Sequence, residues 1–259
     1  MSAREDGRRL DGKTAVVTGA GGVGSAVGAL LVQRGARVVF WDIDSAAARA
    51  CANSLNAEYG SDRACGLTVD VRERSAVQQA TAKSAEWADG QIGILSMCHG
   101  ILKTARLFDL TEQDWDEVVV TNSKGRFLAA QAVAQHMIAS RSGGVIIDVG
   151  SFTGERIAVG RLHYCVSNAV GEALTRAMAV DLGKYGIRAV SVSSGPIDTP
   201  LLGDRARDPQ RMARFLEHIP LGRLGMPSDV AELVAFVASS EAHDWTGGSI
   251  ALDGGWMAG

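Results

Sequence analysis

The sequence predicts a doubly wound α/β fold, in which helices cover both faces of a seven-stranded parallel sheet. Short β-rich segments alternate with helical segments from beginning to end. The strand candidates are continuous apolar runs with little alternation, as expected when both faces of a sheet are covered. A repeated β-α-β order implies parallel strands joined by right-handed crossovers. We therefore expect residues 1–259 to form one domain.

The elements follow one another in a regular order. Strands are expected at residues 14–18, 37–42, 65–70, 92–97, 144–149, 187–193 and 249–253. Helices are expected at residues 23–35, 45–60, 74–88, 111–120, 124–140, 169–186 and 227–240. The helical periodicity of the segment at 169–186 already begins at residue 164. Residues 199–227 are irregular and long enough to form a substrate lid.

Composition and charge exclude several classes of protein. The formal net charge is −3 and the sequence pI is about 6.0, so nothing indicates binding to nucleic acid or to an anionic membrane. No segment approaches the ~18 uninterrupted apolar residues of a membrane span, and the charged N-terminal segment lacks the apolar region of a secretory signal. The four cysteines form no C-x-x-C pair, and no cluster has metal-ligand spacing. We expect a cytoplasmic protein with reduced thiols, no metal and a small-molecule substrate.

A glycine-rich turn follows the first strand and opens the first helix. Gly19, Gly21 and Gly24 satisfy G-x-G-x-x-G, and Gly22 and Val23 lie in the same turn. Glycines there permit a tight turn and let the backbone approach a pyrophosphate at a helix N-terminus. The turn therefore predicts a dinucleotide site in a Rossmann-type fold.

Asp42 ends the second strand, where an acidic residue accepts hydrogen bonds from an adenosine ribose. A carboxylate at this place repels a 2′-phosphate, and the glycine turn contains no Arg or Lys. Both observations favour NAD(H) over NADP(H). The alternative is that Asp42 is only the solvated end of a strand.

Further segments stand in a distinctive order. They are "TNSKGRF" with Asn122, "IIDVGSFTG" with Ser151, "RLHYCVSNAVGEAL" with Tyr164, and the later "SGPIDTP", "LGRLGMPSDVA" and "TGGSIALDGG". Together with the glycine turn, they resemble the short-chain dehydrogenase/reductase family across essentially the whole chain. The resemblance implies a nicotinamide-dependent oxidoreductase in which Asn122, Ser151 and Tyr164 share the chemistry.

The same resemblance implies further binding residues and an assembly. Asp70 would contact the adenine, and Ile197 and Thr199 would hold the nicotinamide carboxamide. Helices 124–141 and 164–185 would form the faces of a homodimer or homotetramer. The full predicted cofactor-binding set is Gly19, Gly21, Gly22, Val23, Gly24, Asp42, Asp70, Val71, Gly100, Ile197 and Thr199.

Asn168 departs from the family pattern at a position that matters. The family has a lysine four residues after the tyrosine, and here that residue is Asn168, which completes the predicted catalytic set. The glycine turn is also one residue shorter than the family's. The fourth strand ends in "MCHG" (97–100), and Ser194 stands where a proline is usual. These departures cluster around the cofactor and catalytic positions.

The chemistry explains why a lysine would matter. Tyr164 can act as the general acid or base on a substrate oxygen that Ser151 polarises. A phenol titrates near pH ~10, and a nearby cation lowers such a pKa by roughly 1–3 units. Asn168 supplies no formal charge, although its amide could donate to a ribose hydroxyl. Alcohol oxidation is therefore expected to be slow or to need alkaline pH, whereas ketone reduction should suffer less.

Other polar residues offer two interpretations each. His99, at the end of the fourth strand, could handle a proton or only make structural hydrogen bonds. His163 adjoins Tyr164, but neighbouring helical residues face different ways. Arg156 and Arg161 could reach an anionic substrate or lie in solvent.

The sequence favours an NAD(H)-dependent oxidoreductase that interconverts a secondary alcohol and a ketone. Residues 101–107, 152–159 and 199–220 would line the substrate pocket, whose apolar composition suggests a medium-sized substrate. Two alternatives remain open: a nucleotide-binding protein without redox activity, and a non-redox dehydratase or isomerase on the same fold.

Overall fold

A parallel β-sheet forms the centre of the molecule. The computed structural model describes residues 9–202 and 209–259, and within them seven strands lie in the order β3-β2-β1-β4-β5-β6-β7. Every pairing is parallel, as predicted. The strands are β1 (Thr14–Thr18), β2 (Arg37–Asp42), β3 (Ala64–Thr68), β4 (Ile94–Met97), β5 (Gly144–Ser151), β6 (Ile187–Ser194) and β7 (Ser249–Leu252).

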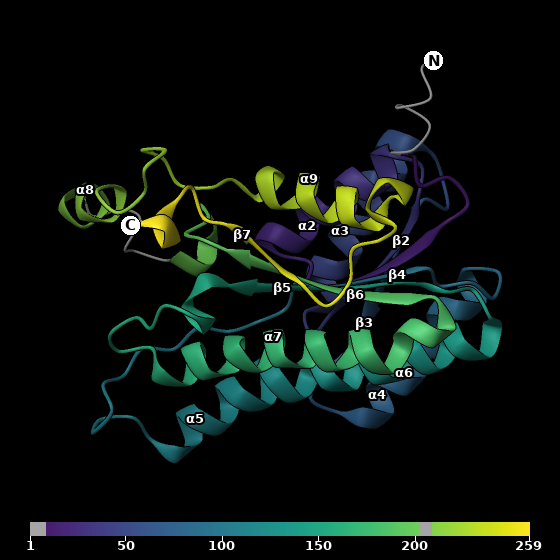
Figure 1. Ribbon diagram of the computed structural model, residues 1–259. Helices are drawn as coiled ribbons and strands as arrows, with labels where there is room; N and C mark the ends of the chain where they lie inside the picture. Colours follow the sequence, from purple (N-terminus) through teal and green to yellow (C-terminus); the bar gives the residue numbers. More distant parts are fainter. Residues whose placement is uncertain (1–8, 203–208) are drawn as a thin grey trace.

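Helices cover both faces of this sheet (Figure 1). One face carries α2 (Gly22–Gln33), α3 (Ser45–Tyr59) and α9 (Pro227–Ala238). The other carries α4 (Arg74–Trp87), α5 (Glu112–Val119), α6 (Gly125–Ser140) and α7 (Leu162–Leu182). The predicted doubly wound architecture is therefore confirmed.

Successive strand residues supply two separate cores. Val17 and Phe40 face α2, α3 and α9, whereas their neighbours Val16 and Trp41 face α4 and α6. All four are 0% exposed. Each large apolar side chain buried in this way contributes about 1.5–3 kcal/mol. Because both sides of each strand are buried, the strands read as unbroken apolar runs in the sequence.

Two helix boundaries differ from the prediction and concern the site. Helix α7 begins at Leu162, two residues before the start of the periodic segment predicted from residue 164, so Tyr164 and Asn168 lie within one regular helix as expected. The helices predicted at 111–120 and 124–140 are joined by a π-helical turn, Val120–Lys124. Such turns within α-helices often occur at functional sites.

Part of the predicted lid is described. Helix α8 (Pro209–Leu216) lies beside the C-terminal segment (Figure 1), and the aromatic rings of Phe215 and Trp256 are 5.2 Å apart. Residues 203–208 of the predicted lid lie outside the described residues.

Candidate active site

The glycine turn is shaped by close backbone approaches. Gly19 has φ +83° and Gly22 has φ +42°, both in the left-handed region that favours glycine. A Cβ atom on Gly24 would overlap the carbonyl oxygen of Gly19, so helix α2 can begin directly against the turn only with glycine there. This is the arrangement that presents a helix N-terminus to a pyrophosphate.

A cavity of about 500 Å³ lies next to the glycine turn, at the carboxyl ends of the strands. Its lining includes these residues of the predicted cofactor set: Gly19, Gly21, Gly22, Val23, Asp42, Asp70, Val71, Gly100 and Thr199. Gly24 and Ile197 lie outside the lining, and Ile197 is buried against Gly225. The cavity opens where ligands bind in parallel α/β sheets, and the glycine cradle fits a dinucleotide.

Asp42 is held in a fixed orientation at the cavity wall. Its Oδ2 accepts a hydrogen bond from the backbone N–H of Ala20 at 2.6 Å, and its Oδ1 accepts one from Asp44 N–H at 2.8 Å. Each carboxylate oxygen retains a lone pair for a further donor. Asp42 is therefore part of the cavity lining and not merely a solvated strand end.

Arg72 is a cation in the cavity lining that the glycine turn did not reveal. Its guanidinium binds the Asp70 carboxylate, with Nη2 2.6 Å from Oδ2. The hydrogen bonds from Arg72 lower the pKa of Asp70. The sequence signal for this pair is that an acidic residue, Asp70, and a basic residue, Arg72, stand two positions apart in the turn after β3.

Asn122 occupies the middle of the π-helical turn and is 1% exposed. Its Oδ1 accepts from the backbone N–H of Ile101, and its Nδ2 donates to the Ile101 carbonyl, both at 2.9 Å. The same Nδ2 lies 3.1 Å from Oγ of Ser167 on α7. Asn122 thus ties the segment after β4 to the helix that carries Tyr164.

Ser151 and Tyr164 are brought to the same region by the packing of β5 on α7. Ser151 is the last residue of β5, and its hydroxyl lies 3.1 Å from Oγ1 of Thr153. A Cβ on Gly150 would lie 3.4 Å from Oδ1 of Asn168, so the end of β5 runs against the turn of α7 that follows Tyr164. The three residues predicted to share the chemistry therefore gather at one end of the sheet.

The amide of Asn168 is engaged inside the protein. It is 2% exposed, and its Nδ2 donates to the Tyr164 carbonyl at 2.9 Å. Its Oδ1 lies 3.5 Å from Nη2 of Arg126. Both ends of the amide thus have partners other than a ribose hydroxyl.

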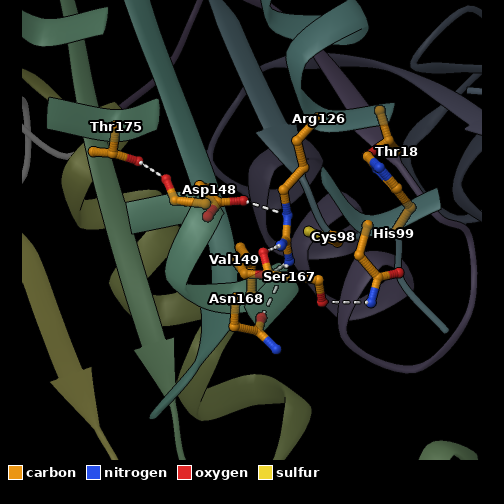
Figure 2. A network of polar contacts seen from close by, with 12 residues as sticks. Thr18, Cys98, His99, Arg126, Asp148, Val149, Ser167, Asn168 and Thr175 are labelled. Carbon is orange, nitrogen blue, oxygen red and sulfur yellow. Dashed lines mark hydrogen bonds and ion pairs between the residues drawn. The ribbon is translucent and has the colours of Figure 1, made fainter. Parts of the chain in front are cut away.

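Arg126 and Asp148 form a buried ion pair that the sequence reasoning missed (Figure 2). Nε of Arg126 lies 2.8 Å from Oδ1 of Asp148, and the side chains are 4% and 1% exposed. Burial raises the pKa of Asp148, whereas the guanidinium opposes that increase. The available signal was a single charged residue within each of two apolar elements, "GRFLAAQAVA" and "GVIIDVGS".

His99 lines the cavity, and one of its ring nitrogens is held by a structural contact. Its Nδ1 lies 2.6 Å from Oγ1 of Thr18, and its Nε2 is buried beside Gly125. Burial, together with the nearby charge of Arg126, lowers the pKa of His99 to about 3. A histidine that remains neutral at pH 7 is a weak proton donor.

The remaining polar candidates point elsewhere. His163 is 0% exposed and lies near Asp114 and Lys103, on the α5 side of α7. Arg156 donates to the carbonyl oxygens of Trp256 and Gly259, both at 2.9 Å, so it holds the C-terminal segment over the loop after β5.

Trp256 is a second feature that sequence reasoning missed. Its ring contacts those of Phe152, Phe215 and His218, with centroids 5.1–5.2 Å apart. These rings join the loop after β5, helix α8 and the C-terminal segment. They therefore form an aromatic wall beside the predicted substrate region.

Metal-binding and membrane-spanning features are absent from the described residues. Among residues 9–202 and 209–259, no group of three or more His, Cys, Asp or Glu side chains could hold a metal ion. Within the same part of the chain, no helix is both long and apolar enough to cross a membrane. The four cysteines are free.

Comparison with known proteins gives a consistent result. Residues 17–257 match the family described as Enoyl-(Acyl carrier protein) reductase. The chain is 36% identical to human (3R)-3-hydroxyacyl-CoA dehydrogenase, covering 95% of this chain and 96% of that protein. It is 33% identical to D-threitol dehydrogenase of Mycolicibacterium smegmatis, covering 96% and 94%.

A solved structure agrees with this result. The gluconate 5-dehydrogenase from Burkholderia cenocepacia, in complex with NADP and tartrate, superimposes with a TM-score of 0.93 at 30% identity, covering 99% of each chain. The parallel sheet, the glycine turn and the grouping of Asn122, Ser151 and Tyr164 fit these similarities. The chain is therefore an oxidoreductase of the short-chain dehydrogenase/reductase family.

Proposed function

We propose that this protein uses NAD(H) to interconvert a secondary alcohol and a ketone, with Tyr164 as the general acid or base. The observation that supports the proposal is that Asn122 bonds both to Ile101 of the cavity lining and to the helix of Tyr164, while β5, which ends at Ser151, packs against the same helix. Each of these residues has a role that its chemistry allows.

The cofactor would lie along the cavity. The turn at Gly19–Val23 would meet the pyrophosphate, Asp42 the ribose and Thr199 the nicotinamide end. A nicotinamide dinucleotide supplies the hydride acceptor for oxidation and the hydride donor for reduction. The side chains of this chain then have only to orient the substrate and move one proton.

That proton moves at the phenol of Tyr164. In oxidation the tyrosinate accepts the hydroxyl proton as hydride leaves the carbinol carbon, and in reduction the phenol returns a proton to the ketone oxygen. Ser151 polarises the substrate oxygen by donating a hydrogen bond to it. Asn122 keeps α7 in register with the segment after β4.

The preference for NAD(H) rests on Asp42. Its carboxylate stands at the cavity wall, where it would accept from the ribose hydroxyls and repel a 2′-phosphate. Arg72, the cation of the same wall, is neutralised by Asp70 and so offers a phosphate less attraction. The related gluconate 5-dehydrogenase structure contains NADP, so competition between the two cofactors is the direct test.

The substrate class is proposed from the relatives and the aromatic wall. The relatives are named for 3-hydroxyacyl-CoA, D-threitol and gluconate substrates, all of which carry a secondary alcohol. Trp256 and Phe152 form an apolar surface beside Tyr164's segment, which favours a medium-sized substrate with an apolar part.

We further propose that the protein acts in the cytoplasm as a homodimer or homotetramer of single-domain chains. Helices α6 and α7 carry exposed apolar side chains, with Phe127 41%, Val166 38% and Val180 82% exposed. Exposed apolar residues on adjacent helices are typical of faces that a second copy covers.

The main alternative is a protein that binds the dinucleotide without turnover. The neutral amide at Asn168, with both ends engaged internally, favours this alternative. A non-redox dehydratase or isomerase has less support, because the neutral His99 is poorly suited to acid–base chemistry.

Two measurements test the proposal. NADH binding is followed by cofactor fluorescence, and turnover is followed over a panel of hydroxyacyl thioesters, polyols and cyclic alcohols with their ketones. The expected result is NADH binding together with turnover of at least one substrate pair, lost by about 100-fold or more in Tyr164→Phe. Tyr185→Phe, which changes an exposed tyrosine, is the matched control. NADH binding without turnover would favour the alternative, and absence of NADH binding would refute both.

A further inference from the structure

A permanently charged group lies behind the helix that carries Tyr164. The Arg126 side chain is 4% exposed, and its guanidinium stays protonated at all physiological pH values. Nη1 lies 3.3 Å from the Ser167 carbonyl, and Nη2 lies 3.4 Å from the Val149 carbonyl and 3.5 Å from Oδ1 of Asn168. Figure 2 shows the guanidinium between Asp148 and Asn168.

The two charges of the ion pair lie at different positions along helix α7. Arg126 contacts Ser167 and Asn168, one turn after Tyr164. At Gly171, two turns after Tyr164, a Cβ would overlap Oδ2 of Asp148 and lie 3.2 Å from Nη1 of Arg126, so the carboxylate reaches α7 at this later turn, where the guanidinium also borders it. The positive end of the pair is therefore the end nearer to Tyr164.

Two ionisable groups near this pair are uncharged at pH 7, and a third, Glu172, is a neighbouring carboxyl. Directly after β4, burial raises the pKa of the Cys98 thiol to about 12 and lowers the pKa of His99 to about 3. On α7, burial raises the pKa of Glu172, which faces Glu155 and Arg176. Arg126 and Asp148 form the buried ion pair on this side of α7.

The ionisable groups on the other side of α7 have interaction partners of their own. His163 faces α5, and burial lowers its pKa. Lys103 binds both Asp114 and Glu117. Arg156, in the loop after β5, binds the C-terminal carbonyl groups. Arg126 is therefore a buried cation in direct contact with the turn that follows Tyr164.

We propose that Arg126 is a positioning residue that supplies, from inside the protein, the positive charge that favours the tyrosinate form of Tyr164. The proposal rests on the proposed function of Tyr164 as the acid or base. Asp148 holds the guanidinium in place, and the amide of Asn168 is matched to it because its oxygen can accept from Nη2. A lysine at position 168 would place a second cation near this guanidinium.

The positive charge of Arg126 would act on Tyr164 through the protein interior, where solvent screens it little. Interactions in a buried environment are attenuated much less than those in water, and a fixed cation lowers the pKa of a nearby phenol. Because Asp148 partly cancels the charge, we expect a shift of roughly 0.5–1 pKa unit. Removing the charge should lower the tyrosinate fraction at pH 7 by about 3- to 10-fold.

The first experiment titrates Tyr164 without any substrate. Tyrosinate absorbance is measured against pH in the full-length chain, and the same background carrying Tyr164→Phe is subtracted to remove the other two tyrosines. Three backgrounds are compared: the natural chain, Asp148→Asn, and Arg126→Gln with Asp148→Asn. A control background, Arg37→Gln with Asp89→Asn, neutralises an ion pair at the start of β2.

The expected order of the Tyr164 pKa is Asp148→Asn lowest, the natural chain next and the doubly neutral variant highest. The control should match the natural chain. Equal pKa values in the natural chain and the folded doubly neutral variant would overturn the proposal. If that variant does not fold, Arg126→Met combined with Asp148→Leu, which also removes both charges, replaces it, and an unchanged Tyr164 pKa there contradicts a guanidinium effect.

The second experiment introduces a lysine in two backgrounds. Asn168→Lys is measured in the natural chain and in the doubly neutral variant, with kcat and KM for alcohol oxidation as functions of pH. We expect kcat at pH 7 to rise at least 10-fold more in the doubly neutral background, with KM little changed. An equal gain in both backgrounds would overturn the proposed match between Arg126 and Asn168. Turnover that is absent from every variant would refute the proposed function, whereas the titration order would still decide the role of Arg126.

Discussion

The amide oxygen of Asn168 lies 3.5 Å from Nη2 of Arg126, while the amide nitrogen of the same side chain donates to the carbonyl of Tyr164. Asn168 therefore links a buried cation to the first turn of the tyrosine helix. An asparagine is suited to this position because one end of its amide accepts and the other donates. The departure from the family pattern at this position thus belongs to a set that includes Arg126 and Asp148.

Breaking the Arg126–Asp148 pair should destabilise the protein strongly. Asp148→Ala leaves a guanidinium without its counter-ion in a region that is 4% exposed, so we expect a loss of about 3–5 kcal/mol in the free energy of unfolding. Arg126→Met combined with Asp148→Leu removes both charges and should cost less than the single change. Urea denaturation measures both variants. A single variant within ~1 kcal/mol of the natural chain would contradict the prediction.

Gly171 should tolerate no side chain. A Cβ there would overlap Oδ2 of Asp148 and lie 3.2 Å from Nη1 of Arg126, so Gly171→Ala should cost about 1–3 kcal/mol. Gly183 ends the same helix with helical φ, and a Cβ added to it would meet no atom within 4 Å, so Gly183→Ala should be neutral or stabilising by up to ~1 kcal/mol. Thermal unfolding of the two variants gives the comparison. Equal stability of both variants would show that the ion pair can move aside.

Asp42 should control cofactor choice. Asp42→Asn removes a charged acceptor from the cavity wall, so NADH should bind about 10- to 100-fold more weakly while NADPH gains relative to NADH. Asp44→Asn is the control, because Asp44 caps helix α3 and lies outside the cavity lining. The ratio of the two dissociation constants, measured by fluorescence, is the readout. An unchanged ratio in Asp42→Asn would remove the basis for NAD(H) preference.

His99 should make stability depend on pH. Its folded-state pKa of about 3 lies below the ordinary value of 6.5, so the unfolded chain binds the proton first as the pH falls. Stability should therefore be complete above pH ~6.5 and decrease toward pH ~3, by about 2–3 kcal/mol between pH ~7 and ~4.5.

His99→Gln should reduce this dependence, measured as the change in urea midpoint between the two pH values. His243→Gln, which alters an exposed histidine, should leave it unchanged. His163 contributes in the same direction, because burial also lowers its pKa, and remains in both variants. An identical pH dependence in His99→Gln and the natural chain would contradict a buried, neutral His99.

The fold could be predicted because its signals are local. Strands such as β1 and β5 are apolar runs because both of their faces are buried. The turn at Gly24 is recognisable because only glycine permits such a close backbone approach. The periodic segment from residue 164 also predicted the start of α7 to within two residues, although Ser167 and Asn168 bond back to the carbonyl of Tyr164. The roles of the predicted catalytic and cofactor residues stay predictions that the variants above can test.

By itself, the sequence determined the alternation of strands and helices, the dinucleotide turn and the missing lysine at Asn168, since these depend on residue type and spacing along the chain. Only the tertiary structure decided that Arg126 of α6 and Asp148 of β5 meet behind Asn168 of α7, and that Arg72 and Trp256 border the site. The physical reason is that electrostatic and ring contacts depend on distances in space. Packing, rather than proximity in sequence, sets the distances between these residues.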